Sequence, residues 1–409
     1  MSGCLTVMLC LSLLLSGCAP AENGGENSLL PPEVVEAFQP EPLGTGEITY
    51  ETGAESLSAD QEALLLDYFT RSYEALARLE EADFADLFSD DTQARISSAE
   101  VDLQVGMRTM IDGLDYSLTG YQYTILCRGV TAQEDGSVAV DAMERSTQNF
   151  AQLPGITSER SWTFHRFVLE QRNGAWTIRS HMQHNALFGQ LMDLAGGMAA
   201  EVPEAYLAAA ESYLDTLQAA RDALEAQRGE AGSLPDADVA YDREAALAYA
   251  DQYAMTRNPD WVDYTGSGGN CQNYVSQCLL AGGIPMDTQG SAVWKWYDSA
   301  FSNAPTASGR SGSWASVTQF LAYASSNTGF GLAAAVDDPY FTGQPGDLLE
   351  MGTESGWRHT VIIRDLVTDD AGETVDYLIN SNTNDMKNFP ASLYGYPVVI
   401  LTRIAGWNR

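Results

Sequence analysis

The sequence predicts an α+β protein with two folded domains, and its length and the order of its patterned segments support this. At 409 residues the chain exceeds one typical domain. In each half, segments with apolar residues at helical spacing precede segments rich in β-branched and aromatic residues. Helices followed by antiparallel strands are the order typical of an α+β fold.

The N-terminus has the features of an export signal. Residues 1–17 are apolar but too few to span a bilayer as a stable helix. They end in a segment that resembles the lipobox of bacterial lipoproteins, Leu15-Ser16-Gly17-Cys18. In that family the cysteine is lipidated and the preceding peptide is removed. No Lys or Arg precedes the apolar stretch, and a plain secretory signal is the alternative. In both cases we expect an extracytoplasmic protein, which a lipid on Cys18 would anchor to the cell membrane.

Residues 18–56 are rich in Glu, Gly, Pro and Asn. We expect them to form a disordered, acidic tether. The whole chain has a formal net charge of −35 and no basic cluster. A nucleic-acid partner is therefore not expected, because phosphate binding needs clustered Lys and Arg.

The first folded domain is expected at residues 57–198. A capping box at Ser58 and Gln61 begins a helix, and a further helical stretch is expected near residues 84–88. Strand-like segments follow at residues 116–130, 137–150 and 161–171, and the Asn173-Gly174 turn predicts a hairpin into residues 175–180. This pattern resembles the cone-shaped fold shared by SnoaL-like and nuclear-transport-factor-like domains. The resemblance implies a cavity for a small ligand or a protein partner.

Three of the four histidines, His165, His181 and His184, lie in this domain. A metal site would need further ligands, and no nearby Cys, Asp or Glu completes one. We therefore interpret them as histidines at strand ends or on the surface. No metal and no cofactor is expected.

Residues 199–238 are expected to connect the two domains. Apolar residues at helical spacing predict a helix over residues 203–228, and Gly, Ser and Pro follow it. The second domain then covers residues 239–409. We expect helices at residues 242–254 and 314–324, and strands at residues 347–351, 358–366, 374–380 and 397–404.

Between the first two helices of this domain, Gly268 and Gly269 lead into a short helix that begins at Cys271. Unpaired N–H groups at a helix N-terminus stabilise a thiolate and lower the pKa of the thiol. Cys271 is thus predicted to be a nucleophile, and the alternative is an inert core cysteine. Cys278 lies seven residues further along the same apolar helix face. At about 10 Å from Cys271, it is too far away for a disulfide. Three scattered cysteines after Cys18 do not make a disulfide framework.

His359 is the one histidine of the second domain, and it lies in an apolar strand. A thiol that attacks an amide needs a group that first accepts and then donates a proton, and an imidazole does both. The imidazole in turn needs a residue that orients it. Asn380 and Asn382 end the next strand and share one face of it, and either could orient His359.

The segment that begins at Cys271 is similar to the Asp-Cys-Thr-Asn-Phe-Val-Ser-Gln stretch of the bacterial putative amidase domain, for it reads Cys271-Gln272-Asn273-Tyr274-Val275-Ser276-Gln277. That family belongs to the papain-like group with the CHAP and NlpC peptidoglycan hydrolases. The order of Cys, His and a polar residue matches, as do Trp294, Trp314 and the Gly346-Asp347-Leu348-Leu349 stretch. The resemblance covers nearly all of residues 241–409 and implies a papain-like fold.

Two positions depart from the family pattern. The family has Asp immediately before the cysteine, where this chain has Asn270. The family's later motif is Asn-x-His-Thr, and here Asn382 takes the place of that histidine. An asparagine can orient an imidazole through its carbonyl group, as in papain-like enzymes.

The resemblance implies a cysteine amidohydrolase or peptidase that cleaves amide bonds of cell-wall peptides. Cys271 would attack, His359 would move the proton and Asn382 or Asn380 would orient it. Residues around the cysteine and two tryptophans are candidates for binding the substrate or the oxyanion: Asn270, Gln272, Asn273, Trp294 and Trp314. The alternatives are a non-catalytic papain-like binding module, a transfer reaction through the same three residues, and a zinc site that lacks a third ligand.

Overall fold

The structure is a computed structural model that describes residues 41–290 and 292–409. The expected signal peptide, the candidate lipidation site Cys18 and most of the expected tether lie outside the described residues. Within them, none of the helices has the length and apolar character needed to cross a membrane.

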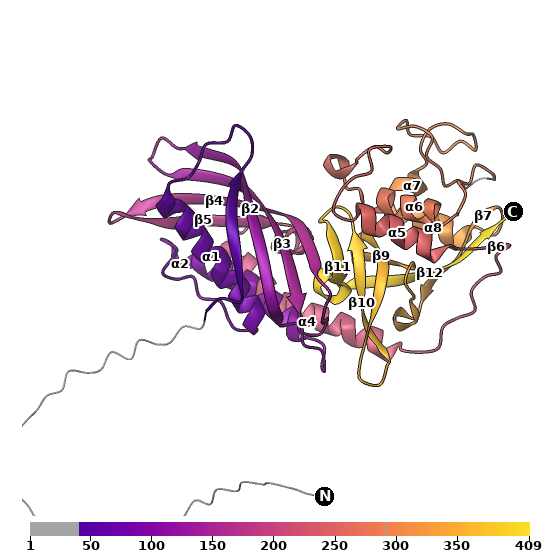
Figure 1. The fold of residues 1–409 in the computed structure, drawn as a ribbon, viewed down its shortest axis with the longest axis horizontal. Helices are drawn as coiled ribbons and strands as arrows, with labels where there is room; N and C mark the ends of the chain where they lie inside the picture. Colours follow the sequence, from indigo (N-terminus) through magenta and orange to yellow (C-terminus); the bar gives the residue numbers. More distant parts are fainter. Residues whose placement is uncertain (1–40, 291) are drawn as a thin grey trace, which may run out of the picture. The chain divides into compact units, whose positions relative to one another are not determined.

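The first half of the described chain contains one strand, two helices, four strands and two further helices (Figure 1). In chain order these are β1 (Gly44–Tyr50), α1 (Ala59–Arg78), α2 (Asp91–Thr109), β2 (Leu118–Ala132), β3 (Val138–Phe150), β4 (Ser158–Arg172), β5 (Ala175–His184), α3 (Ala186–Ala195) and α4 (Pro203–Ala226). The capping box at Ser58 and the hairpin at Asn173-Gly174 are both present, and both turn residues have positive φ. The expected helices at α1 and α4 and the four expected strands are confirmed.

Strand β1 corrects the expectation of a disordered segment up to residue 56. It pairs in parallel with β2, from Gly44 opposite Tyr121 to Tyr50 opposite Cys127. A Cβ atom on Gly46 would lie 1.9 Å from the Tyr123 ring, and one on Gly44 would be as badly placed against Tyr121. In the sequence, Gly44 and Gly46 resemble part of a flexible linker. In the structure, their lack of a side chain lets β1 lie against the two tyrosine rings.

Helix α2 was not expected, and residues 85–87 form a turn and Phe88 a bridge to Ile178 in place of the helix expected near residues 84–88. Asp90 caps α2 through a hydrogen bond from the Gln93 N–H. Its buried face carries polar side chains among the apolar ones, including Ser97, Glu100 and Arg108. A mixed face of this kind hides the apolar periodicity that would have predicted a helix.

After the two-residue strand β6, the second half contains helices first and longer strands afterwards, as expected. In chain order these are β6 (Val239–Ala240), α5 (Arg243–Tyr253), η1 (Thr265–Ser267), α6 (Cys271–Ala281), α7 (Gly312–Ala315), α8 (Val317–Ser326), β7 (Gly331–Asp338), η2 (Tyr340–Thr342), β8 (Leu348–Thr353), β9 (Gly356–Thr368), β10 (Thr374–Ser381), β11 (Met386–Pro390), η3 (Ala391–Tyr394) and β12 (Val398–Asn408). The single helix expected at residues 314–324 is two helices, because Ser316 has extended backbone angles.

In the described part of the chain, the strands join into one 12-stranded sheet with the order β1-β2-β3-β4-β11-β10-β9-β8-β12-β6. β5 pairs with β4, and β7 pairs with β12. The first-half and second-half strands meet where Met386 pairs with Arg160 and Lys387 pairs with Glu159. The molecule is thus mixed α+β, with a large sheet that is antiparallel except for the pairing of β1 with β2.

The second-half strands separate two hydrophobic cores, as β9 shows. Ile362 belongs to a core with residues of α5, α6 and α8, whereas Val361 and Ile363 belong to a core that continues into the first half. Successive residues of a strand point to opposite faces, so both faces of β9 are covered. This alternation decides where each candidate site residue points.

Two of the three first-half histidines are not at strand ends or on the surface. His165 and His181 are buried, and their rings stack with each other at a centroid distance of 5.3 Å. His181 Nε2 lies 3.0 Å from His165 Nδ1, and His165 Nε2 lies 3.2 Å from a Glu144 oxygen. Polar partners explain their burial. His184 is exposed, as expected.

Candidate active site

Cys271 is the first residue of α6, at the position that the glycine turn predicted. Gly268 and Gly269 both have positive φ, which lets the chain turn directly into the helix. The N–H of Asn270 donates to the Thr383 hydroxyl at 2.6 Å, and this bond ties the start of α6 to the turn after β10. Cys278 is fully buried in the core on the helix side of the sheet.

The Cys271 side chain is 7% exposed and packs with Val317 and Leu321 of α8. Burial raises the pKa of its thiol, while backbone N–H groups of Thr360 and Gln272 act in the opposite direction. The sequence predicted the reverse, a pKa lowered by the helix N-terminus. The helix end does favour the thiolate, but desolvation is the larger effect.

His359 is 3% exposed and is held through one ring nitrogen. Its Nε2 lies 2.7 Å from the Ser381 hydroxyl and 2.8 Å from the Tyr394 hydroxyl. Among the described residues, Nδ1 has no hydrogen-bond partner. If Nε2 carries the proton and donates it to these hydroxyls, Nδ1 is left as an acceptor. Burial lowers the pKa of His359 to about 3, so the ring is neutral at pH 7.

The structure does not join Cys271 and His359 by a hydrogen bond. His359 pairs with Met351 and has the same parity as Val361 and Ile363, so its ring points to the sheet face opposite α6. Tyr394 nevertheless lies close to both residues. Its hydroxyl contacts the imidazole, and a charge on Cys271 would raise the pKa of this tyrosine.

The two expected orienting residues bind elsewhere. The Asn380 side chain donates to Asp251 at 2.8 Å and accepts from the Asn388 N–H at 2.9 Å. The Asn382 amide nitrogen donates to three backbone carbonyls, those of Tyr253, Ala254 and Thr256. Both asparagines share one strand face, as predicted, but it is the face toward α5. The residue between them, Ser381, points to the other face and meets His359.

The two departures from the family pattern lie in contact with each other. The Asn270 Nδ2 group donates to Asn382 Oδ1 at 2.7 Å. Both are buried, and Asn270 Oδ1 accepts further bonds from Tyr264 and Asn273. Two neutral amides thus form a link at the place where the family pattern has an aspartate and a histidine. The substitutions concern the junction of α6 and β10 rather than the imidazole of His359.

The turn after β10 is held in an unusual conformation. Thr383 and Asn384 have φ of 76° and 50°, and such values are uncommon outside glycine, above all for a β-branched residue. Asp385, which is buried, fixes the turn through two hydrogen bonds from Arg257 and one from the Thr383 N–H. Backbone strain of this kind is often found at functional sites.

The remaining candidate residues are buried, and three of them make hydrogen bonds to other parts of the second half. Asn273 donates to the Val262 carbonyl and accepts from the Trp314 indole, and the Trp294 indole donates to Ser276. Both tryptophans are fully buried, so neither lines an open cleft. Gln272 is also buried, and its side-chain oxygen has no partner among the described residues.

Sequence reasoning missed three residues at the site. Ser381 lies between Asn380 and Asn382, and its opposite orientation in the strand was the available signal. Trp357 packs with the Cys271 cluster, and its nearness to His359 in sequence was the available signal. Tyr394 lies in η3, and no motif pointed to it.

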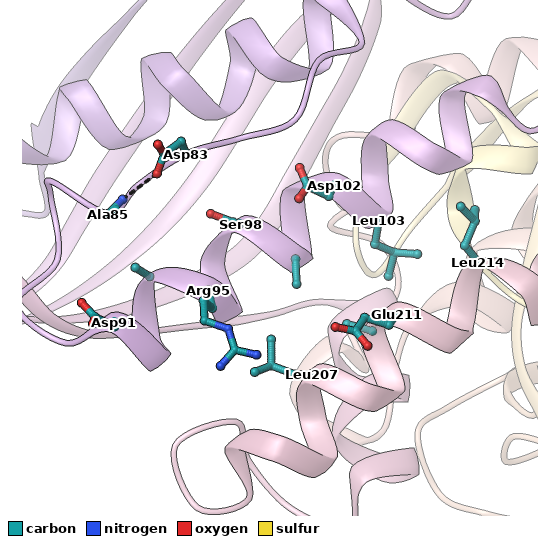
Figure 2. Close-up of a pocket in the computed structure, with 13 residues that line it drawn as sticks. Asp83, Ala85, Asp91, Arg95, Ser98, Asp102, Leu103, Leu207, Glu211 and Leu214 are labelled. Atoms are coloured by element: carbon teal, nitrogen blue, oxygen red, sulfur yellow. Dashed lines mark hydrogen bonds between the residues drawn. The ribbon is translucent and has the colours of Figure 1, made fainter.

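A groove of about 480 Å³ lies away from these residues, between α2 and α4 (Figure 2). Asp91, Arg95 and Asp102 of α2 and Leu207 and Glu211 of α4 are among its lining residues, and the Arg95 side chain extends toward Leu207. It contains none of the candidate residues. No group of three or more metal-ligating side chains suitable for an ion occurs in the described range.

Comparison with known proteins finds similarity for the second half of the chain. Residues 240–401 match the model of a family described as "Putative amidase domain". An uncharacterized protein, YhbB of Bacillus subtilis (strain 168), is 32% identical over 152 residues, which are 36% of this chain and 43% of that protein. The chain thus spans less than half of that relative's length. No solved structure matches the chain. Residues 240–401 are therefore similar to an amidase-domain family, which suggests an amide-bond hydrolase.

Proposed function

We propose that residues 239–409 form a papain-like cysteine amidohydrolase domain that cleaves amide bonds of cell-wall peptides. The observation that carries the proposal is the placement of Cys271 at the N-terminus of α6, beside the backbone of the strand that holds His359. The match of this segment to an amidase family supports the reaction class. The cell-wall substrate rests on the resemblance and on the export signal.

In the proposed reaction, the Cys271 sulfur attacks the carbonyl carbon of the amide and its proton passes to His359 Nδ1. The backbone N–H of Cys271, at the start of α6, would stabilise the oxyanion. The protonated imidazole then gives its proton to the nitrogen of the leaving amine, and a thioester remains on Cys271. Water attacks the thioester, and its proton passes by way of His359 to the departing thiol.

Ser381 and Tyr394 act on this reaction as positioning residues. Their hydroxyls hold Nε2, which fixes the ring plane and leaves Nδ1 for the substrate side. The thiol and the ring are not hydrogen-bonded in the described structure, and the ring points to the sheet face opposite α6, so the proposed reaction requires the two groups to approach each other when the substrate binds. Catalytic hydrogen bonds are often long in enzymes without substrate.

The rest of the chain is proposed to place this domain at the cell surface. Residues 1–17 would be the lipoprotein signal and Cys18 the lipidated residue, with membrane attachment through that lipid. Residues 57–198 would form a cone-like domain that binds a small ligand or a protein partner, joined through residues 199–238.

The test is the release of new amines from peptidoglycan fragments by the full chain and two cysteine variants. Cys271→Ala should reduce release by roughly 10³-fold or more, since it removes the nucleophile. Cys278→Ala is the matched control, because it removes a cysteine of the same helix that lies in the core. Its release should stay within a few-fold of wild type. Undiminished release by Cys271→Ala would disprove the proposal.

A second candidate function is a papain-like binding module without activity. Two observations favour it: burial raises the pKa of the Cys271 thiol, and no hydrogen bond joins Cys271 to His359 in the described structure. In this case neither the wild type nor Cys271→Ala releases amines, while both retain the same wall fragments in a binding assay. Amine release by the wild type alone rejects the binding module.

A further inference from the structure

A narrow pocket lies where α2 and β4 meet the segment after β10, and it shares Tyr394 with the surroundings of His359. Its described lining includes Arg108, Arg160 and Ser161 from the first half and Asn384 and Tyr394 from the second. Its free volume is about 20 Å³. This is room for one occupant near the size of a water molecule.

The pocket is positively charged in a very acidic protein. Two arginines line it, and no Asp or Glu is among its described lining residues, although the chain carries a formal net charge of −35. Within the described structure Arg108 makes no ion pair. Arg160 makes one, with a Glu144 oxygen 3.7 Å from its guanidinium. A buried cation is normally paired with an anion, and the buried Arg108 guanidinium has no such partner in the described structure.

Two hydrogen-bond donors at the pocket have no partner in the described structure. Arg108 is 3% exposed, and its two terminal nitrogens donate to the Gln104 carbonyl and to the Gln148 side chain, both at 3.1 Å. Its Nε has no partner, and neither has the Ser161 hydroxyl, which is also buried. Buried donors without partners are rare in folded proteins, and they require a reason.

We propose that this pocket is a binding site for a single monatomic anion of the size of chloride, held by Arg108, Arg160 and the Ser161 hydroxyl. The ion satisfies the two unpaired donors and compensates the unpaired guanidinium charge. A water molecule fills the same volume but leaves the charge uncompensated. Burial, followed by the charge of Arg160, lowers the pKa of Arg108 to about 9, and a bound anion opposes both effects.

The test measures the ³⁵Cl NMR line width of sodium chloride in the presence of the full chain, as bromide is titrated in to compete. Chloride that exchanges with the site broadens the line, and bromide should remove the excess. Arg108→Met should weaken binding roughly 10- to 100-fold, because it removes a charge-assisted hydrogen bond and its charge. Arg95→Met is the matched control, as Arg95 is an exposed arginine of the same helix outside this pocket. It should leave the excess line width unchanged.

Ser161→Ala provides a second variant, since it deletes one unpaired hydroxyl and keeps the backbone bond of Ser161 to Asp385. It should lower affinity even if Arg108→Met fails to fold. In crystals soaked in bromide, an anomalous difference peak should lie between Arg108 and Ser161. Line broadening that is the same in wild type, Arg108→Met and Ser161→Ala would overturn the proposal, as would the lack of an anomalous peak.

Discussion

Asn270 and Asn382, the two residues that depart from the pattern of the similar family, form a direct contact with each other. Their side chains are hydrogen-bonded to each other, and Asn382 also donates to three carbonyls at the end of α5. This amide pair closes the junction between α6 and β10, beside Cys271. We expect this pair to stabilise the start of α6, which can be tested through stability.

We predict that Asn382→Ala destabilises the protein by roughly 2–3 kcal/mol, because it leaves buried polar groups of Asn270 and of the α5 end without partners. The double variant Asn270→Asp with Asn382→His, which has the residue types of the family pattern, should be more stable than either single variant. The free energy of unfolding in urea measures both effects. Strictly additive effects of the two single changes would contradict a direct pair.

The Cys271 thiol is buried, and this changes the expectation for its reactivity. Its pKa is raised, and that of His359 is lowered to about 3, so at pH 7 both groups are neutral. A thiolate–imidazolium pair is therefore not the resting state. In the proposed reaction, the proton would therefore move from the thiol to the imidazole only when the sulfur attacks.

We predict slow labelling of Cys271 by iodoacetamide at pH 7, with a rate that increases above pH 9 as the thiolate forms. Peptide mass spectrometry assigns the label to Cys271, and the same protein in urea supplies the reference rate. His359→Ala should leave the shape of the pH profile unchanged, because the imidazole is uncharged over this range. An apparent pKa below 8, lost in His359→Ala, would contradict this account and restore the activated thiolate.

The side chains that hold His359 could be predicted only in part. Strand alternation correctly placed Asn380 and Asn382 on one face, but it did not say which face was covered by α5. That depends on helix packing, which the local sequence does not encode. Consequently Ser381 and Tyr394, the actual partners of the ring, were missed.

At the scale of elements, β1 extends the sheet beyond the expected start of the folded domain. It lies parallel to β2 with Gly44 and Gly46 against tyrosine rings. Glycine-rich composition predicted a tether, since the sequence does not reveal the partner strand. Periodic segments such as α1, α4 and the long strands were predicted well, because each carries its own pattern.

We predict that Gly46→Ala destabilises the protein by roughly 2 kcal/mol, since its Cβ atom would lie 1.9 Å from the Tyr123 ring. Gly120→Ala in the neighbouring β2 is the matched control, because its nearest non-adjacent atom lies 3.8 Å from the new Cβ. Urea unfolding at equal m-values compares the two. Equal stability of the two variants would show that β1 is not packed as described.

At the scale of the whole molecule, one sheet and one core run through both halves. Buried polar contacts strengthen this continuity, such as the Tyr116 hydroxyl that donates to Asp376 at 2.7 Å. The sequence predicted the α+β class and many of the helices and strands in their order, but not β1, α2 or α3. It did not predict the pairing of β4 with β11, because β11 is short and the pairing joins segments more than 200 residues apart.

The most direct test of the central claim is to trap the acyl group on Cys271. A wall peptide is mixed with the full chain, the reaction is quenched in acid, and the Cys271 peptide is examined by mass spectrometry. We predict a thioester that carries the acyl half of the substrate, that is removed by hydroxylamine and that does not form on Cys278. Release of the amine product without any adduct on Cys271, and at the same rate in Cys271→Ala, would contradict cysteine catalysis at this site.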